Sequence, residues 1–106
     1  MPKFLVKARY TPEGAKGVQS GGGTSRREAI AKMAAGLGGS LESFYFAFGE
    51  TDAYVILDVP DNRTAAAASI AVNTAGGASA EVVVLLTPEE IDEAAKLSVD
   101  YRPPGA

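Results

Sequence analysis

The residues between positions 40 and 59 constrain the fold of this chain more than any other stretch. They read SLESFYFAFGETDAYVILDV and contain three of the four phenylalanines and two of the four tyrosines. Residues 41–48 and 53–59 have the composition and alternation of β-strands, and Gly49-Glu50-Thr51-Asp52 between them is a short turn. The stretch therefore predicts a β-hairpin against which the rest of the fold packs.

The flanking segments supply the other elements. The alternation of residues 3–10 predicts a first strand. An apolar stripe with helical spacing then predicts a helix that starts near Ser25, where Ser25 and Glu28 have the spacing of a capping box, and that stops at Gly38-Gly39. Glycine content favours a loop over 11–24. Later in the chain we expect a second helix over 64–74 capped by Asp61 or Asn62, a fourth strand over 80–86, a third helix from the cap Thr87 to about Leu97, and an extended tail over 98–106.

The order β-α-β-β-α-β, followed by a small helix, predicts an α+β fold of the ferredoxin-like type. The expected sheet has the strand order 4-1-3-2, with the first and third strands central and parallel and both long helices on one face. The chain has 106 residues, which suits a single core. We assign residues 1–97 to one domain and residues 98–106 to its tail.

Composition excludes several classes of function. The chain contains neither cysteine nor histidine, which rules out disulfides, thiolate and histidine metal sites and a Ser-His-Asp triad. No cofactor or metal is expected. The net charge of −3 argues against a general nucleic-acid binder, and no run reaches the ~18 apolar residues of a membrane helix. With no signal-peptide pattern at its start, the chain is expected to be cytoplasmic, without nucleic-acid or membrane partners.

Alternation also sorts the strand residues into two faces. The first set is almost wholly apolar and is expected under the helices: Phe4, Val6, Ala8, Tyr10, Leu41, Ser43, Tyr45, Ala47, Ala53, Val55, Leu57, Val59, Ala80, Val82, Val84 and Leu86. The second set has no helix left to cover it: Lys3, Leu5, Lys7, Arg9, Glu42, Phe44, Phe46, Phe48, Tyr54, Ile56, Asp58, Glu81, Val83 and Leu85. Because so large an apolar patch is rare on a monomer, we expect a second copy to cover it, with two sheets packing into a barrel. The alternative is that the third helix or the tail folds back over it.

With these elements placed, the chain resembles the GYD domain family, small and mostly uncharacterised proteins of the ferredoxin-like, dimeric α/β-barrel type. The resembling segments are Tyr10-Thr11-Pro12-Glu13-Gly14 with Lys16-Gly17, Ser25-Arg26-Arg27, Phe44 to Asp52, and Leu86-Thr87-Pro88-Glu89-Glu90. The resemblance implies a homodimer or a higher homo-oligomer and no established activity. Thr51 stands where the family's tyrosine falls, so a role of that tyrosine in relatives is not transferred to this chain.

Two groups of residues are candidate ligand sites. Lys7, Arg9, Tyr54, Asp58 and Glu81 would form a polar cluster in a barrel lined by Phe46 and its neighbouring phenylalanines; the alternative is a structural ion-pair network at a dimer interface. The segment 21–27 would hold an anion through a helix N-terminus with Arg26 and Arg27, or would be only a flexible lead into the helix.

A third, weaker candidate is the turn between the second and third strands. Glu50 and Asp52 are two carboxylates on one turn that would touch a metal, but Asp52 is more simply read as a turn-former.

The sequence leaves two functions open. The first is a homodimeric α/β-barrel module that binds a small ligand or serves in assembly, which the lack of histidine, cysteine and any cofactor motif favours. The second is a cofactor-independent isomerase or monooxygenase that acts on a small hydrophobic substrate inside the barrel. Analogy of fold alone is a weak argument for the second, since one fold supports many functions.

Overall fold

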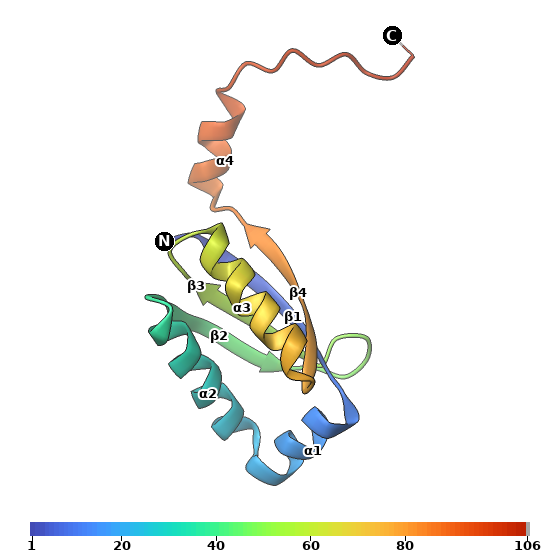
Figure 1. The fold of residues 1–106 in the computed structure, drawn as a ribbon. Coiled ribbons are helices and arrows are strands. Elements are labelled where there is room, and N and C mark those ends of the chain that lie inside the picture. Colours follow the sequence, from blue (N-terminus) through green and yellow to red (C-terminus); the bar gives the residue numbers. More distant parts are fainter. Residues whose placement is uncertain (106) are drawn as a thin grey trace.

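A computed structural model describes residues 1–105 of the chain as an α+β fold, shown in Figure 1. Its elements, in chain order, are β1 (Lys3–Tyr10), α1 (Pro12–Gly21), α2 (Gly23–Gly36), β2 (Ser40–Phe46), β3 (Ala53–Asp58), α3 (Asn62–Ala75), β4 (Ala78–Leu85) and α4 (Pro88–Ala95).

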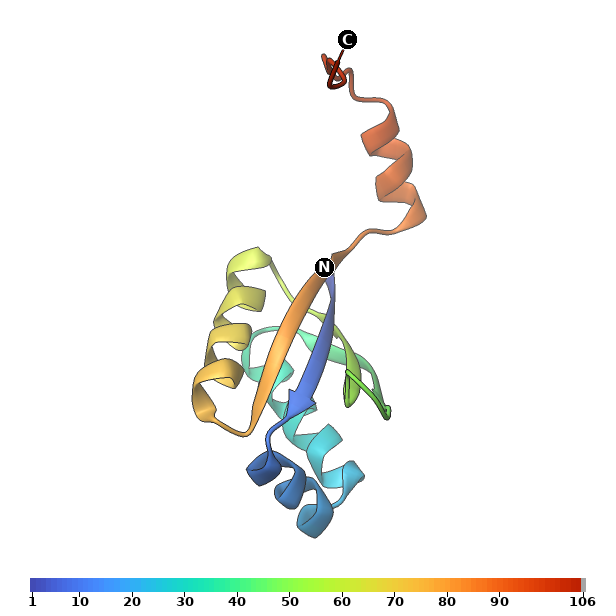
Figure 2. The same cartoon turned by 90° about the vertical axis from the view of Figure 1, so that its right-hand side faces the viewer.

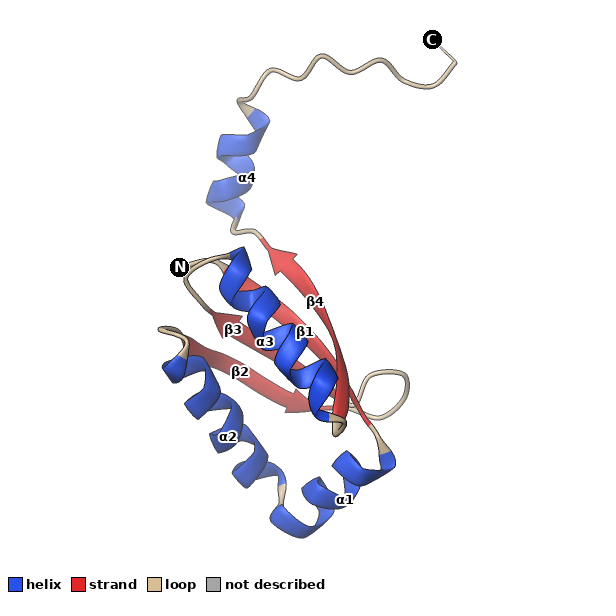
Figure 3. Cartoon of the chain, in the orientation of Figure 1, coloured by secondary structure: helices blue, strands red, loops and turns tan. Residues whose placement is uncertain are grey.

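The four strands form one antiparallel sheet in the order β2-β3-β1-β4, which is the order 4-1-3-2 read from the opposite edge. Helices α2 and α3 both lie on one face of this sheet (Figure 3). The expectation that the first and third strands run parallel is wrong, because β1 pairs with β3 in the antiparallel sense. The crossover through α2 returns β2 in the direction of β1, and the hairpin then reverses the chain into β3.

The glycine-rich segment after β1, expected to be a loop, contains the helix α1. Thr11 is its N-cap and accepts a hydrogen bond from the backbone N–H of Gly14 over 3.2 Å, and Pro12 occupies the first helical turn. The same triplet of Thr, Pro and Glu opens α4, where Thr87 and Glu90 form a complete capping box. A strong N-terminal signal therefore outweighs the low helix propensity of the glycines that follow.

Helix α2 begins two residues earlier than predicted. Its N-cap is Gly22, which adopts φ 85°, and no side chain caps this end, so the predicted capping box of Ser25 and Glu28 is wrong. The predicted cap of α3 is confirmed, because the Asp61 carboxylate accepts from the backbone N–H of Thr64 over 2.9 Å.

The core lies between the helices and the inner face of the sheet. It is built from side chains of β1, of β3 and of the residue that follows β3, together with one alanine from each of the two helices: Phe4, Val55, Leu57, Val59, Ala53, Ala34 and Ala65. Alanine on the helix side allows the helix backbones to lie close to the strands. Phe4 and Val59 are the largest side chains that are almost completely buried.

A β-bulge in β2 reverses the facing of the aromatic residues. The register of β2 against β3 shifts between Leu41 and Ser43, so that Leu41 pairs with Leu57 but Phe44 pairs with Val55. One extra residue in a strand moves every later side chain to the other face.

The predicted facing of β2 beyond the bulge is therefore wrong. Phe44 and Phe46 lie on the helix side, and Tyr45, opposite Tyr54, lies on the open side. Phe48 lies beyond the end of β2 and is fully exposed.

Helix α4 and the residues after it project away from the sheet as an arm, as Figures 1 and 2 show. All residues of α4 are exposed. The radius of gyration is 16.7 Å, whereas a compact chain of this length has one of about 13 Å. In residues 1–105 the arm does not fold back over the open face of the sheet. Ala106, the last residue of the expected tail, lies outside the described residues.

Within residues 1–105, no helix has both the length and the apolar character that crossing a membrane requires.

Candidate functional site

The open face of the sheet carries a row of four residues, one from each strand, of which three are apolar. Its members pair across adjacent strands and are Ser43, Ile56, Leu5 and Val83. A second row runs beside it and consists of Tyr45, Tyr54, Lys7 and Glu81. We call these two rows together the open face. Tyr45 is 72%, Tyr54 40% and Val83 39% exposed, so large side chains remain uncovered here.

The predicted polar cluster does not form as one group. Lys7 lies between Tyr54 and Glu81 in the register of the sheet, whereas Arg9 is exposed and opposite Ser79. Asp58 lies at the other end of β3. These residues are therefore spread over the surface of the sheet and do not converge on one pocket.

Asp58 belongs to a separate ion-pair group with Lys3. The Lys3 ammonium is 3.2 Å from the Asp58 carboxylate and 2.6 Å from that of Glu42. The N-terminal amine is 3.7 Å from Asp58. The hydrogen bond to Glu42, and then that to Asp58, raises the pKa of Lys3 above its ordinary value. The group ties the start of β1 to β2 and β3, which is a structural role.

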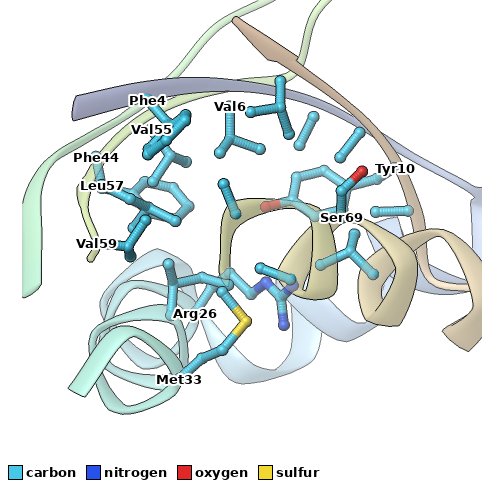
Figure 4. Close-up of a pocket in the computed structure, with 18 residues that line it drawn as sticks. Phe4, Val6, Tyr10, Arg26, Met33, Phe44, Val55, Leu57, Val59 and Ser69 are labelled. Atoms are coloured by element: carbon cyan, nitrogen blue, oxygen red, sulfur yellow. The ribbon is translucent and has the colours of Figure 1, made fainter. Parts of the chain in front are cut away.

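Phe46, predicted for the barrel interior, belongs to an aromatic cluster on the helix side. Its ring centroid is 5.0 Å from that of Phe44 and 6.4 Å from that of Tyr10. Phe44 and Tyr10 also line a narrow apolar cavity of about 40 Å³ between the sheet and helices α2 and α3, shown in Figure 4. Other side chains of this cavity include Phe4, Val6, Ile30, Met33, Leu57, Val72 and Val82.

A larger groove of about 530 Å³ lies among α1, α2 and α3. Glycine and alanine make up most of its lining: Tyr10, Gly14, Gly17, Val18, Gly21, Gly22, Ser25, Arg26, Ala29, Met33, Ala71, Val72, Ala75, Gly77 and Ala78. Five of these residues also line the apolar cavity: Tyr10, Arg26, Met33, Val72 and Ala78. The groove and the cavity are therefore adjacent, and Arg26 is the charged residue that lines both.

Arg26 and Arg27, predicted together for an anion site, have different surroundings. Arg27 is exposed, whereas Arg26 lines both the groove and the cavity. The Arg26 guanidinium carbon is 6.0 Å from the ring centroid of Tyr10. Its Nε is buried and has no hydrogen-bond partner among the described residues. Figure 4 shows Arg26 and Met33 opposite the sheet residues Phe4 and Val6.

The turn carboxylate Asp52 is structural. Its side chain accepts a hydrogen bond from the backbone N–H of Tyr10 over 2.9 Å, and its own N–H donates to the carbonyl of Ala8 over 2.9 Å. These bonds fix the hairpin loop to the end of β1. Residues 1–105 contain no group of three or more acidic side chains placed to hold a metal.

Sequence reasoning missed both the groove and the reversal of β2. The groove exists because Pro12–Gly21 is helical, and the Thr-Pro-Glu triplet is a usable signal for that helix. The bulge had a weaker signal, the consecutive polar residues Glu42 and Ser43 inside an otherwise alternating strand.

A sequence model of the GYD domain matches residues 4–95, which is most of the chain. The chain belongs to the GYD domain family. Comparison with curated proteins and with solved structures gave no significant match. In this GYD domain, Thr51 lies in the loop between β2 and β3 and is partly buried.

Proposed function

We propose that this GYD domain is a homodimeric small-ligand-binding module of ferredoxin-like arrangement. Two open faces pack together to form an α/β barrel, and the ligand binds on the helix side of each sheet. The observation that carries the proposal is the uncovered open face, where Leu5, Ile56 and Val83 form an apolar row beside two exposed tyrosines. Burial of such a surface is the main favourable term in association.

A second copy is the partner that the charges favour. The strands on this side carry three cations, Lys3, Lys7 and Arg9, and three anions, Glu42, Asp58 and Glu81. A two-fold axis places the same patch against itself, so a patch with both signs of charge pairs with its own copy. A strongly basic or acidic partner would meet like charges on half of the surface.

The arm provides a second contact to the partner. It follows directly from the edge strand β4 and carries the exposed apolar residues Ile91, Leu97, Val99 and Tyr101. An isolated helix of eight residues is only marginally stable in water, because nucleation is costly. Packing of the arm on the second copy would stabilise α4 and cover these side chains.

The structure removes one argument for the alternative enzymatic role. A cofactor-independent isomerase or monooxygenase was inferred from phenylalanines lining the barrel, but Phe44 and Phe46 lie on the helix side of the sheet. The open face presents tyrosines, aliphatic residues and the pair Lys7 and Glu81, without a pocket among the described residues that would bring a substrate to them.

Mass in solution tests the proposal. We expect the wild-type chain to be a dimer by light scattering and Ile56→Glu, which buries a charge at the centre of the interface, to be a monomer with an unchanged circular dichroism spectrum. Ala67→Glu is the matched control, because Ala67 is exposed and lines neither the groove nor the cavity; this variant stays dimeric. A monomeric wild type, or a dimeric Ile56→Glu, would refute the dimer.

A further inference from the structure

We infer that the groove among α1, α2 and α3 binds an amphipathic monocarboxylate, with its carboxylate on Arg26 and its apolar tail along the groove, against the apolar residues that the groove shares with the cavity between helices and sheet. The inference deepens the proposed function and rests on its ligand-binding half. It does not depend on the dimer, since the groove and the open face lie on opposite sides of the sheet.

The charge of the groove favours a ligand with a negatively charged group. Arg26 is the one charged residue among the described side chains that line the groove and the cavity, and no carboxylate lines either. Its Nε is buried without a hydrogen-bond partner. A buried donor without a partner loses its hydration with no compensation, and a bound carboxylate accepting from Arg26 would restore a bond. Guanidinium and carboxylate match in planar, two-bond geometry.

The start of α2 strengthens the same preference. Gly22, the N-cap of α2, and Ser25, in its first turn, line the groove together with Arg26. No side chain caps this helix end, and the N-terminus of a helix carries a partial positive charge. The anion-binding end of α2 and the Arg26 guanidinium are therefore presented to the same space.

The shape of the groove admits a small molecule. Its volume of about 530 Å³ lies within the ~300–1,000 Å³ range of small-ligand sites. Glycine keeps it open: a Cβ added at Gly17 or Gly22 would meet no atom within 4 Å. At its inner end, the cavity presents apolar side chains such as Ile30, Phe44 and Val82. A ligand with a polar head at Arg26 can thus place an apolar part against the core.

One arginine and an apolar inner wall favour a carboxylate over a phosphate. A phosphoryl group carries about 1.5 to 2 negative charges at neutral pH, so a single cation leaves part of this charge unbalanced. A monocarboxylate is balanced by Arg26 alone, and its apolar tail matches the largely apolar lining of the groove.

Calorimetric titration of the full chain with three probes tests this assignment. Octanoate combines the head and the tail, 1-octanol has the tail without the charge, and inorganic phosphate has charge without a tail. We expect octanoate to bind at least about tenfold more tightly than either of the other two. No binding of octanoate, or equal affinity for 1-octanol or phosphate, would overturn the inference.

Two neighbouring arginines provide a matched pair of variants. Arg26→Gln removes the charge inside the groove and is expected to weaken octanoate binding at least about tenfold. Arg27→Gln removes an exposed charge from the same helical turn and leaves binding unchanged. Equal loss in both variants, or in neither, would contradict a role for the groove.

A third variant tests the groove independently, in case Arg26→Gln does not fold. Gly17→Phe fills part of the groove from a position where a Cβ meets no atom, and it leaves Arg26 in the chain. It should abolish octanoate binding while the circular dichroism spectrum is kept. Unaltered binding in a folded Gly17→Phe variant would overturn the inference. The monomeric Ile56→Glu variant should still bind octanoate, so failure of the dimer and failure of the ligand site give different results.

Discussion

Two glycines of α1, three residues apart, have different surroundings. Gly14 packs against Gly77, at the start of β4, so closely that a Cβ at Gly14 would overlap the Gly77 carbonyl. Thr11 reinforces this contact, because its N–H donates to the Gly77 carbonyl over 3.1 Å and its hydroxyl donates to that of Gly76 over 2.9 Å. Gly17 has open space around it. The first glycine is needed for docking of α1, whereas the second only leaves room.

We therefore predict opposite effects of alanine at the two positions. Gly14→Ala forces the backbones of α1 and Gly77 apart and should lower the free energy of unfolding by about 1–3 kcal/mol. Gly17→Ala should raise it by up to about 1 kcal/mol, since alanine favours a helix. Urea denaturation measures both. A neutral Gly14→Ala variant would show that α1 is not docked where the structure places it.

A pH dependence belongs to Asp61, the N-cap of α3. Hydrogen bonds donated by the backbone N–H and the hydroxyl of Thr64 lower the pKa of Asp61 below its ordinary value of 3.8. A carboxyl with a lowered pKa in the folded state adds stability that is present above the unfolded pKa and lost as the pH falls through the folded pKa.

Asp61→Ala should accordingly melt at a lower temperature than the wild type at neutral pH, and the difference should shrink as the pH falls below 3.8. Thermal melts from about pH 7 to about pH 2 measure it. Asp61→Asn is the control, because it keeps an oxygen acceptor and has no carboxyl to titrate. A melting difference for Asp61→Ala that is constant over this range would contradict the assigned cap.

At the scale of elements, the bulge in β2 allows Leu41 and Phe44, which are three positions apart, to face the helix side together. Phe44 packs on the helix side with Phe46, and Tyr45 between them is exposed on the open face. We predict that Phe44→Ala lowers the free energy of unfolding by at least about 2 kcal/mol, since the ring is partly buried.

Tyr45→Ala, in contrast, should cost under about 1 kcal/mol when measured at a protein concentration low enough to keep the chain monomeric. Urea denaturation of the pair compares neighbours in one strand. The reverse order of effects would place the bulge elsewhere.

Most elements could be predicted from sequence because their signals are local. Asp61 and Thr87 are caps that act over three residues, and the alternation of β1 survives intact in the structure. The facing of β2 could not be predicted in the same way, because the extra residue becomes visible only when β2 is paired with β3. The groove depends on Arg26, Gly14 and Ala71 coming together from three helices, a contact that no spacing in the sequence encodes.

At the scale of the molecule, the sheet separates two surfaces of different character. The open face is broad and mixes apolar with charged residues, whereas the helix side holds a groove with one arginine. The arm extends the long axis of the molecule to 56 Å and adds exposed apolar residues beyond the sheet.

We predict that the double variant Ile91→Asp and Leu97→Asp weakens self-association without lowering the stability of the monomer, because both side chains are exposed within one chain. Sedimentation over a range of concentrations measures the dissociation constant. The control is Glu89→Gln with Glu93→Gln, which alters the same helix without adding charge to apolar positions. An unchanged dissociation constant in the aspartate variant would contradict the proposed contact between the arm and a second copy.

The bulge at Glu42 gives β2 one position at which its length can change without exchanging the two sides of the sheet. Leu41 and Ser43 pair with Leu57 and Ile56, which are neighbours in β3, so loss of the Glu42 codon would leave a regularly alternating strand with Phe44 still on the helix side. Relatives that lack this one residue would therefore keep the same two faces and lose only the local twist that a bulge adds to this edge.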